Sequence, residues 1–142
     1  MAAEGVEVIQ RMAERMTAHD LDGMVELVHE DYQSEQPFHP ARGFSGRAQM
    51  KANWRALLTG VPDMRGEVVA SVQAGDVVWS EWHWVGTTEQ GEPFDMRGVT
   101  QFTVRDGLVV RGRLFTELVE QGGADINDSV KTSSGHRPQL ED

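Results

Sequence analysis

The stretch that decides the fold is Val77-Val78-Trp79-Ser80-Glu81-Trp82-His83-Trp84-Val85-Gly86-Thr87, which holds three of the four tryptophans of the chain. Successive side chains of a β-strand point to opposite faces of a sheet. One face therefore carries Val78, Ser80, Trp82 and Trp84. The other face carries Val77, Trp79, Glu81, His83 and Val85. The stretch predicts a long strand, and the question is which face points into the protein.

Alternation with period two extends on both sides of this stretch. The four alternating runs are Gly66–Ala74, Val77–Thr87, Phe94–Val104 and Leu108–Leu118. The breakers between them are Gly75-Asp76, Gln90-Gly91-Glu92-Pro93 and Asp106-Gly107. Alternating runs joined by short polar turns are typical of hairpins. The pattern predicts an antiparallel meander of four strands.

The even-numbered positions of this meander are expected to face inward. In three runs the apolar residues fall mostly on even positions, among them Val68, Ala70, Val72, Phe94, Met96, Phe102, Val110 and Leu114. A three-residue hairpin loop at Arg105-Asp106-Gly107 would preserve this parity. It would pair Val104 with Leu108, Thr100 with Gly112, and Gly98 with Leu114. By continuity we expect Ser80, Trp82 and Trp84 to point inward.

Helical periodicity occupies the chain before the meander. Apolar residues recur at helical spacing from Gly5 to about Thr17. Asp20 can cap a second, shorter helix whose buried side would carry Met24, Val25, Leu27 and Val28. A short extended piece, Gln33–Gln36, and an irregular loop follow, and a third helix is expected from about Arg47 to Leu58, ended by Gly60 and Pro62. We expect residues 1–120 to form one domain and residues 121–142 a flexible tail, mostly disordered or draped.

Composition restricts the function classes. The chain has 142 residues and no cysteine, which excludes thiol chemistry and cysteine-based zinc sites. It has 23 acidic and 13 basic residues, a balance that argues against a nucleic-acid partner. The first residues do not resemble a signal peptide, and no apolar run is long enough to span a bilayer. We expect a soluble cytoplasmic protein without a membrane partner. No metal-ligand spacing, phosphate loop or nucleophilic triad points to a metal or cofactor.

Gly98 and Gly112 are expected to open space on the inner face. Glycine within a strand marks a bend, a bulge or the close approach of another group. Two inward glycines opposite Trp82 and Trp84 leave room for a ligand under an aromatic wall. In the alternative interpretation, the tryptophans fill that room themselves as packed core.

The inner face carries no acid, so an acid–base group must come from the loop after the second helix. Glu35 is the first candidate and His39 the second, because an apolar pocket raises the pKa of a carboxylic acid toward neutrality. Alternatively, both are solvated loop residues. The outer face carries Trp79, Glu81, His83, Arg97, Arg111, Arg113, Phe115 and Glu117. Its mixture of aromatics and arginines is typical of interfaces, and we expect a homodimer there. Binding of another protein by this face, with a filled interior, is a third possibility.

The order of elements resembles the SnoaL-like branch of the NTF2-like superfamily over about residues 5–120. Supporting motifs are Glu81–Thr87, Arg97–Gly107, Phe44-Ser45-Gly46-Arg47 before the third helix, and Gly107-Leu108-Val109. The resemblance implies an α+β, cone-shaped, cystatin-like roll in which three N-terminal helices pack on a curved antiparallel sheet. The superfamily includes polyketide cyclases, ketosteroid isomerases, limonene epoxide hydrolases and non-enzymatic modules.

The charged positions of those relatives are not retained here. The inward Arg and Asp of the epoxide hydrolases fall on Trp82 and Trp84. The acid on the last strand, which resembles that of the polyketide cyclases, falls on Leu114, and the polar aromatic residue before it falls on Gly112. Leucine cannot transfer a proton, so neither mechanism is carried over by resemblance.

The leading hypothesis is an enzyme that acts on a hydrophobic polyketide- or terpenoid-like ligand by acid–base chemistry: a cyclisation, isomerisation or dehydration. Glu35 or His39 would transfer the proton, and tryptophan N–H groups, Ser80 or Thr100 would orient the ligand. The ligand-binding residues would be Trp54, Ser80, Trp82, Trp84, Met96, Gly98, Thr100, Phe102, Gly112 and Leu114. The alternative is a non-catalytic hydrophobic-ligand-binding or dimerisation module.

Overall fold

A curved sheet of six strands in the order β2-β1-β6-β5-β4-β3 forms the framework of the computed structural model, which describes residues 4–141. The strands are β1 (Val28–Glu35), β2 (Phe44–Ser45), β3 (Arg65–Ala74), β4 (Val77–Thr87), β5 (Pro93–Arg105) and β6 (Leu108–Leu118). The helices are α1 (Glu4–Thr17), α2 (Leu21–Glu26), α3 (Arg47–Gly60) and α4 (Ile126–Ser134), with a 3-10 turn, η1 (Pro40–Arg42). The predicted α+β class and the four-stranded meander are confirmed. Residues 1–3 of the predicted domain lie outside the described residues.

The sheet is mixed, which corrects the prediction of an antiparallel sheet. β1 runs parallel to β6 and antiparallel to β2, whereas all other neighbours are antiparallel. Val28, which we expected on the second helix, begins β1 and lies opposite Val109 of β6. Local periodicity could not reveal this because the partner strand lies about 80 positions along the chain.

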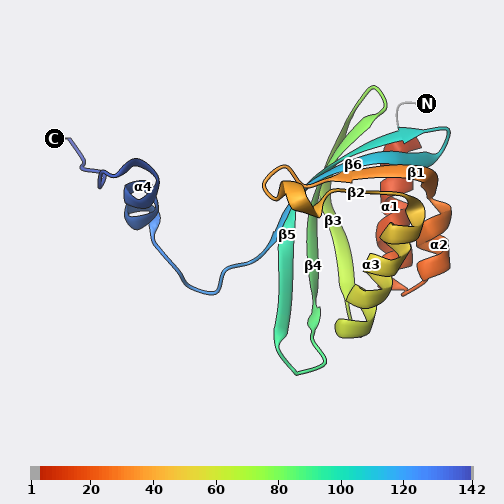
Figure 1. Cartoon of the computed structure of the whole chain (residues 1–142), viewed down its shortest axis with the longest axis horizontal. Helices are drawn as coiled ribbons and strands as arrows, with labels where there is room; N and C mark the ends of the chain where they lie inside the picture. Colours follow the sequence, from red (N-terminus) through yellow and green to blue (C-terminus); the bar gives the residue numbers. More distant parts are fainter. Residues whose placement is uncertain (1–3, 142) are drawn as a thin grey trace.

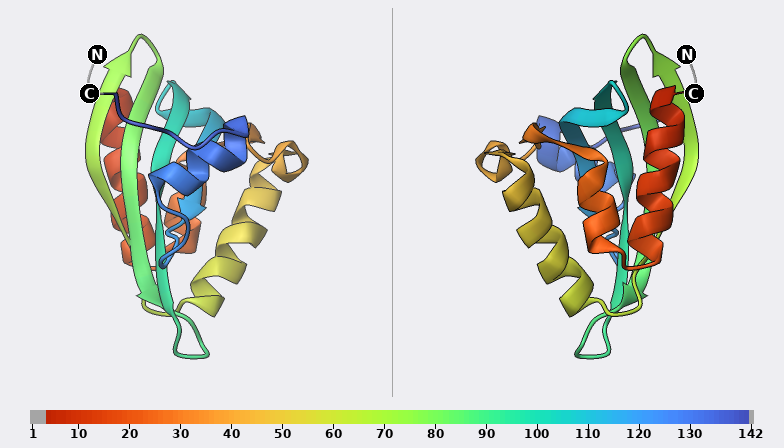
Figure 2. Two further views of the ribbon diagram at one scale, coloured as in Figure 1. Left: turned by 90° about the vertical axis from the view of Figure 1, so that its left-hand side faces the viewer. Right: turned by 90° about the vertical axis from the view of Figure 1, so that its right-hand side faces the viewer.

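Helices α1, α2 and α3 lie on the concave side of the sheet (Figure 2), where α1 runs along β3 and β4 while α3 leans away from the sheet. The predicted apolar stripe of α1 is buried and includes Val8, Ile9, Met12, Ala13 and Met16. Asp20 caps α2 as predicted, since its Oδ1 accepts a hydrogen bond from the Gly23 N–H at 2.9 Å. The diverging helices and the curved sheet together give the conical shape.

Two bulges change which residues face inward. The turn between β5 and β6 has two residues, Asp106 and Gly107, both at positive φ, so Arg105 pairs with Leu108. An extra residue in β6, Val110, then shifts the register, and Thr103 pairs with Arg111. Thr100 therefore lies opposite Leu114, and Gly98 opposite Thr116. The predicted three-residue loop and its pairings are wrong, and Val109 is buried in place of Val110.

The second bulge lies in β3 at Val69. Val68 pairs with Trp82 but Ala70 pairs with Glu81, so Val69 has no pairing residue on β4. Beyond the bulge the inward positions are odd. Ser71 faces inward and its hydroxyl lies 2.8 Å from that of Ser80, whereas Val72, which we expected to point inward, is 63% exposed. The inward orientation of Trp82 and Trp84 is confirmed, since both are buried.

The tail contains a helix where we expected mostly disorder. Asp125 caps the start of α4 by accepting from the Asp128 N–H, and Gly135 ends it in the left-handed conformation. Figure 1 shows α4 set apart from the rest of the chain on an extended linker, and none of its residues is buried. A domain ending near residue 120 remains a prediction. Within residues 4–141, no helix combines the length and the apolarity that a bilayer crossing needs.

Candidate functional site

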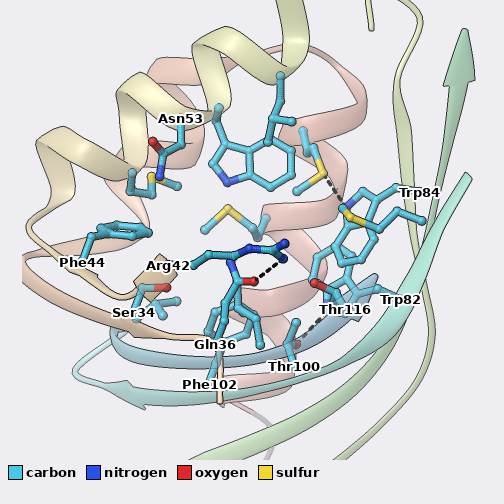
Figure 3. A pocket seen from close by; sticks show the side chains of 18 of the residues that line it. Ser34, Gln36, Arg42, Phe44, Asn53, Trp82, Trp84, Thr100, Phe102 and Thr116 are labelled. Atoms are coloured by element: carbon cyan, nitrogen blue, oxygen red, sulfur yellow. Dashed lines mark hydrogen bonds between the residues drawn. The ribbon is translucent and has the colours of Figure 1, made fainter. Parts of the chain in front are cut away.

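A cavity of about 350 Å³ lies between α3 and the inner face of the sheet (Figure 3). Its walls are mainly apolar. The side chains of Met12, Met16, Val28, Phe44, Met50, Trp54, Leu57, Trp82, Trp84, Met96, Phe102, Val109, Leu114 and Leu118 line it. Its polar lining residues are Tyr32, Ser34, Gln36, Arg42, Asn53, Thr100, Thr116 and Glu117. Such a concave apolar space with a few polar groups is the usual form of a small-molecule site.

Seven of the ten predicted ligand-binding residues line this cavity. They are Trp54, Trp82, Trp84, Met96, Thr100, Phe102 and Leu114. Ser80, Gly98 and Gly112 do not line it. Ser80 is buried on the same face, but the bulge in β3 places Ser71 against it.

The two glycines make room for the protein itself, not directly for a ligand. A Cβ at Gly112 would lie 2.3 Å from the Tyr32 hydroxyl oxygen and 2.8 Å from Cε1 of Phe102. A Cβ at Gly98, whose φ is +154°, would lie 2.2 Å from the main-chain oxygen of Phe115. Gly98 therefore permits the close approach of β6, and Gly112 permits the packing of Tyr32 and Phe102. The cavity lies further toward α3.

Trp82 and Trp84 form the floor of the cavity as a stacked pair. Their ring centroids lie 5.0 Å apart with an interplanar angle of 6°. The Trp82 N–H donates to the Thr100 hydroxyl at 2.9 Å, and the Trp84 N–H donates to the Met16 sulfur at 3.1 Å. Both N–H groups are thus satisfied inside the protein. The floor offers a ligand a flat apolar surface, and the predicted orienting role of these N–H groups is not supported by their hydrogen bonds.

Tyr32 is a buried residue that places its hydroxyl group at the side of the cavity. Burial raises its pKa to about 12, opposed by the nearby Ser34 hydroxyl, which lowers the pKa. The phenol is therefore neutral at physiological pH and can donate a hydrogen bond. Ser34 is itself buried, and its hydroxyl oxygen has no hydrogen-bond partner that meets the usual geometric criteria. Alternation along β1 turns both side chains, Tyr32 and Ser34, toward the interior. Sequence periodicity does not predict this strand as one element, because it assigns the residues of the strand partly to a helix and partly to a short extended piece.

Glu35 points out of the cavity, away from the environment that the sequence suggested. Alternation along β1 turns Ser34 inward and Glu35 to the other face, where Arg111 donates to its carboxylate. This hydrogen bond, together with the positive charges of Arg111 and Arg113, lowers the pKa of Glu35. The expected raised pKa in an apolar pocket is therefore not found for this residue.

The mouth of the cavity carries a polar network contributed by distant parts of the chain. His39, before η1, is hydrogen-bonded through its Nε2 to the Glu117 carboxylate of β6. Arg42 donates to the Gln36 side-chain oxygen at 3.2 Å, and its guanidinium lies 3.8 Å from the Glu117 carboxylate. Figure 3 shows Arg42 and Gln36 projecting over the opening, with Asn53 entering from α3. Glu117 lies opposite Arg97 on the outer face, as expected, and it also contributes to the rim of the cavity.

The outer face of the sheet has its own polar pairs. The Nε2 of His83 lies 2.7 Å from the Asp95 carboxylate, not against Glu81, and Arg97 lies 3.8 Å from the same group. Among residues 4–141, no three histidine, aspartate or glutamate side chains come together as a metal site would require.

Comparison with known proteins gives a family match and several solved folds. A family model described as "SnoaL-like domain" matches residues 9–112. A candidate SnoaL-like polyketide cyclase from Jannaschia sp. CCS1 is 25% identical, with 82% of this chain and 87% of that chain covered and a TM-score of 0.71. None of the curated proteins is similar enough in sequence to match.

Two further solved structures share the fold. A loop-truncation variant of IdmH, a candidate polyketide cyclase from Streptomyces antibioticus, is 26% identical, with 80% and 92% of the two chains covered and a TM-score of 0.68. A Mycobacterium tuberculosis protein in complex with estradiol-17β-hemisuccinate is 17% identical, with 79% and 92% covered and a TM-score of 0.69. The latter similarity concerns the fold alone.

Proposed function

Because this chain belongs to the SnoaL-like domain family, we propose that it is an enzyme acting on a hydrophobic, polyketide- or terpenoid-like ligand. The reaction is acid–base chemistry at a carbon next to a carbonyl group, and it leads to cyclisation, isomerisation or dehydration. Support comes from the apolar cavity, from candidate polyketide cyclases among the similar structures, and from a protein of the same fold whose structure contains a steroid ester.

The observation that carries the proposal is the His39–Glu117 pair at the mouth of the cavity. Glu117 is the one carboxylate among the described residues that line the cavity. His39 is hydrogen-bonded to this carboxylate and so holds it in place, and the Arg42 guanidinium lies 3.8 Å away without a hydrogen bond to it. A carboxylate fixed at the edge of an apolar space can take a proton from a bound ligand. Glu35 and His39 were predicted as alternative acid–base groups. In this proposal Glu117 takes the role first given to Glu35, and His39 supports it.

The proposed proton transfer is balanced within the ligand and this pair. The Glu117 carboxylate takes the proton, and the electrons of the broken C–H bond move onto the carbonyl oxygen to form an enolate. In an isomerisation, the protonated Glu117 returns the proton to another carbon. In a cyclisation, the enolate carbon attacks a second carbonyl of the same ligand, and the alkoxide oxygen that forms takes the proton back from Glu117. In a dehydration, Glu117 protonates the hydroxyl that leaves as water. His39 holds the carboxylate and positions it for both directions of transfer.

Exchange of carbon-bound hydrogen tests this step without knowledge of the natural substrate. The protein is incubated in D₂O with apolar cyclic ketones such as 2-tetralone, and deuterium uptake next to the carbonyl is followed by NMR. We expect the protein to accelerate exchange. Glu117→Gln should remove that acceleration, by about 10²-fold or more for loss of a general base. His39→Gln should reduce it less, because it removes only the support of the carboxylate.

Glu35→Gln is the matched control, since it makes the same chemical change on the outward side of β1. It should retain the exchange activity. Exchange that survives Glu117→Gln but not Glu35→Gln would return the assignment to Glu35. Binding of ketones with no protein-dependent exchange across the series would instead favour the non-catalytic ligand-binding module.

We also propose a homodimer through the outer sheet face. Val72 lies opposite Trp79 on the neighbouring strands β3 and β4, and both are exposed, Trp79 to 40%. An exposed apolar pair beside charged residues is typical of a protein interface. Sedimentation should give a dimer mass for the wild type and a monomer mass for Trp79→Glu. A monomeric wild type at micromolar concentration would contradict the proposal.

A further inference from the structure

Several hydrogen-bond donors are left free at the cavity mouth. The acceptor oxygens of the side-chain amides are already used: that of Gln36 accepts from Arg42, and that of Asn53 accepts from the Gln49 amide at 2.8 Å. The Glu117 carboxylate is bound by His39. What remains is most of the Arg42 guanidinium, which has about five N–H donors and no acceptor, and the NH₂ group of Asn53.

Two charged side chains lie at the mouth, the Arg42 guanidinium and the Glu117 carboxylate. Arg42 is permanently cationic, and its nearest carboxylate, that of Glu117, lies at 3.8 Å, beyond hydrogen-bonding distance. Glu117 is shared with His39, so it does not occupy the planar fork of the guanidinium. A free guanidinium fork matches the two oxygens of a carboxylate.

The interior of the cavity, in contrast, offers no free polar group on its floor. The N–H groups of Trp82 and Trp84 are bonded within the protein, and the remaining floor and walls are largely apolar. The hydroxyls of Tyr32 and Ser34 also line the cavity, but they are neutral. A ligand with an anionic end is therefore best placed with its apolar body on the stacked tryptophans and its anionic end toward the Arg42 guanidinium.

We infer that the cavity selects an apolar ring system that carries a carboxylate at the end facing the mouth. Arg42 binds the carboxylate, Asn53 donates to it from the opposite wall, and the Trp82–Trp84 pair contacts the rings. This inference rests on the proposed function only in taking the same cavity as the ligand site. It concerns recognition and not proton transfer, and Arg42 is its specificity-determining residue.

A matched pair of probes tests the inference in the full-length protein. 2-Naphthoate and 2-naphthamide have the same ring and nearly the same size, but only the first is anionic at neutral pH. Their dissociation constants are measured by calorimetry and by quenching of tryptophan fluorescence. We expect the acid to bind about tenfold more tightly than the amide, the ratio expected for one charge-assisted contact at a partly exposed site.

Arg42→Gln should reduce the acid-to-amide preference to nearly one, mainly by weakening binding of the acid. Arg55→Gln is the control, because Arg55 is an exposed residue of α3 outside the cavity and its loss changes the net charge equally. It should keep the preference. Equal binding of the two probes to the wild type, a preference that survives Arg42→Gln, or failure of the acid to bind the wild type would each overturn the inference.

Glu117→Gln separates this inference from the proposed function. It should abolish hydrogen exchange, yet the acid should bind at least as tightly, since a negative charge near the ligand is removed. Loss of acid preference with retained exchange in the wild type would overturn only the recognition of a carboxylate. Retained acid preference without exchange would overturn only the proposed catalysis.

Discussion

Replacement of Trp82 by alanine tests whether the aromatic floor is part of the packed core as well as a wall of the cavity. Trp82 is 2% exposed, stacks on Trp84 at 5.0 Å and donates a hydrogen bond to Thr100 at 2.9 Å. Loss of a packed tryptophan side chain costs about 3–5 kcal/mol. The cavity of about 350 Å³ borders one side of the ring, so fewer contacts are lost there.

The bordering cavity lowers the expected cost toward about 3 kcal/mol. Thr100 opposes this, because its buried hydroxyl loses its partner, at about 1–3 kcal/mol. We therefore expect the free energy of unfolding to fall by about 4–6 kcal/mol. Trp82→Phe retains most of the ring and loses the N–H, so its cost should be about 1–2 kcal/mol.

The assay is urea denaturation followed by far-ultraviolet circular dichroism, which does not depend on the tryptophan removed. Trp79→Ala is the control, since it removes the same residue type from the same strand on the exposed face. It should cost about 1 kcal/mol or less, measured at two protein concentrations to separate any loss through dimerisation. A cost for Trp82→Ala within about 1 kcal/mol of that control would refute the packing assigned to the inner face.

Three further outcomes are expected. Gly112→Ala should lower the free energy of unfolding, measured by urea denaturation, by about 1–3 kcal/mol, because the added Cβ meets Tyr32 and Phe102. Tyr32→Phe combined with Gly112→Ala should restore part of this free energy. A cost near zero for Gly112→Ala would contradict the close packing. Glu35→Gln should lower the melting temperature at neutral pH. The difference in melting temperature between wild type and variant should disappear as the pH falls from 4.5 through the lowered pKa of Glu35, because protonation of the carboxylate removes its stabilising pair with Arg111. A difference that does not change with pH would count against the Arg111 pair. Deletion of residues 121–142 should leave the melting temperature nearly unchanged, because α4 buries no residue; a large decrease would show that the tail belongs to the domain.

The sequence by itself determined those features that depend on neighbouring residues. Strict alternation placed β4 at Val77–Thr87, and the apolar stripe placed α1. The cap at Asp20 and the turn around Asp106-Gly107 were equally visible, because capping and positive φ are properties of single residues in their local context. The family resemblance, now confirmed over residues 9–112, followed from the order of these elements.

Only the tertiary structure decided the features that depend on strand pairing. A bulge moves every later side chain of its strand to the other face, and neither Val69 nor Val110 differs in type from the valines that pair regularly. The extent of β1 depended on its parallel partner β6, which local periodicity does not report. Inward parity was therefore predicted correctly for Trp82 and Trp84 and wrongly for Val72 and Val110.

The acidic partner of His39 was decided in the same way. His39 and Glu117 are 78 positions apart, and they meet because β1 lies beside β6 and because η1 folds over the end of that pair. Alternation correctly assigned Glu117 to the outer face, opposite Arg97, but it does not report that His39 and Arg42 reach this side chain at the rim of the cavity. Sequence pattern gives the face of a strand on which a residue lies, but the edge of a cavity is formed by chain segments that meet only in the folded protein.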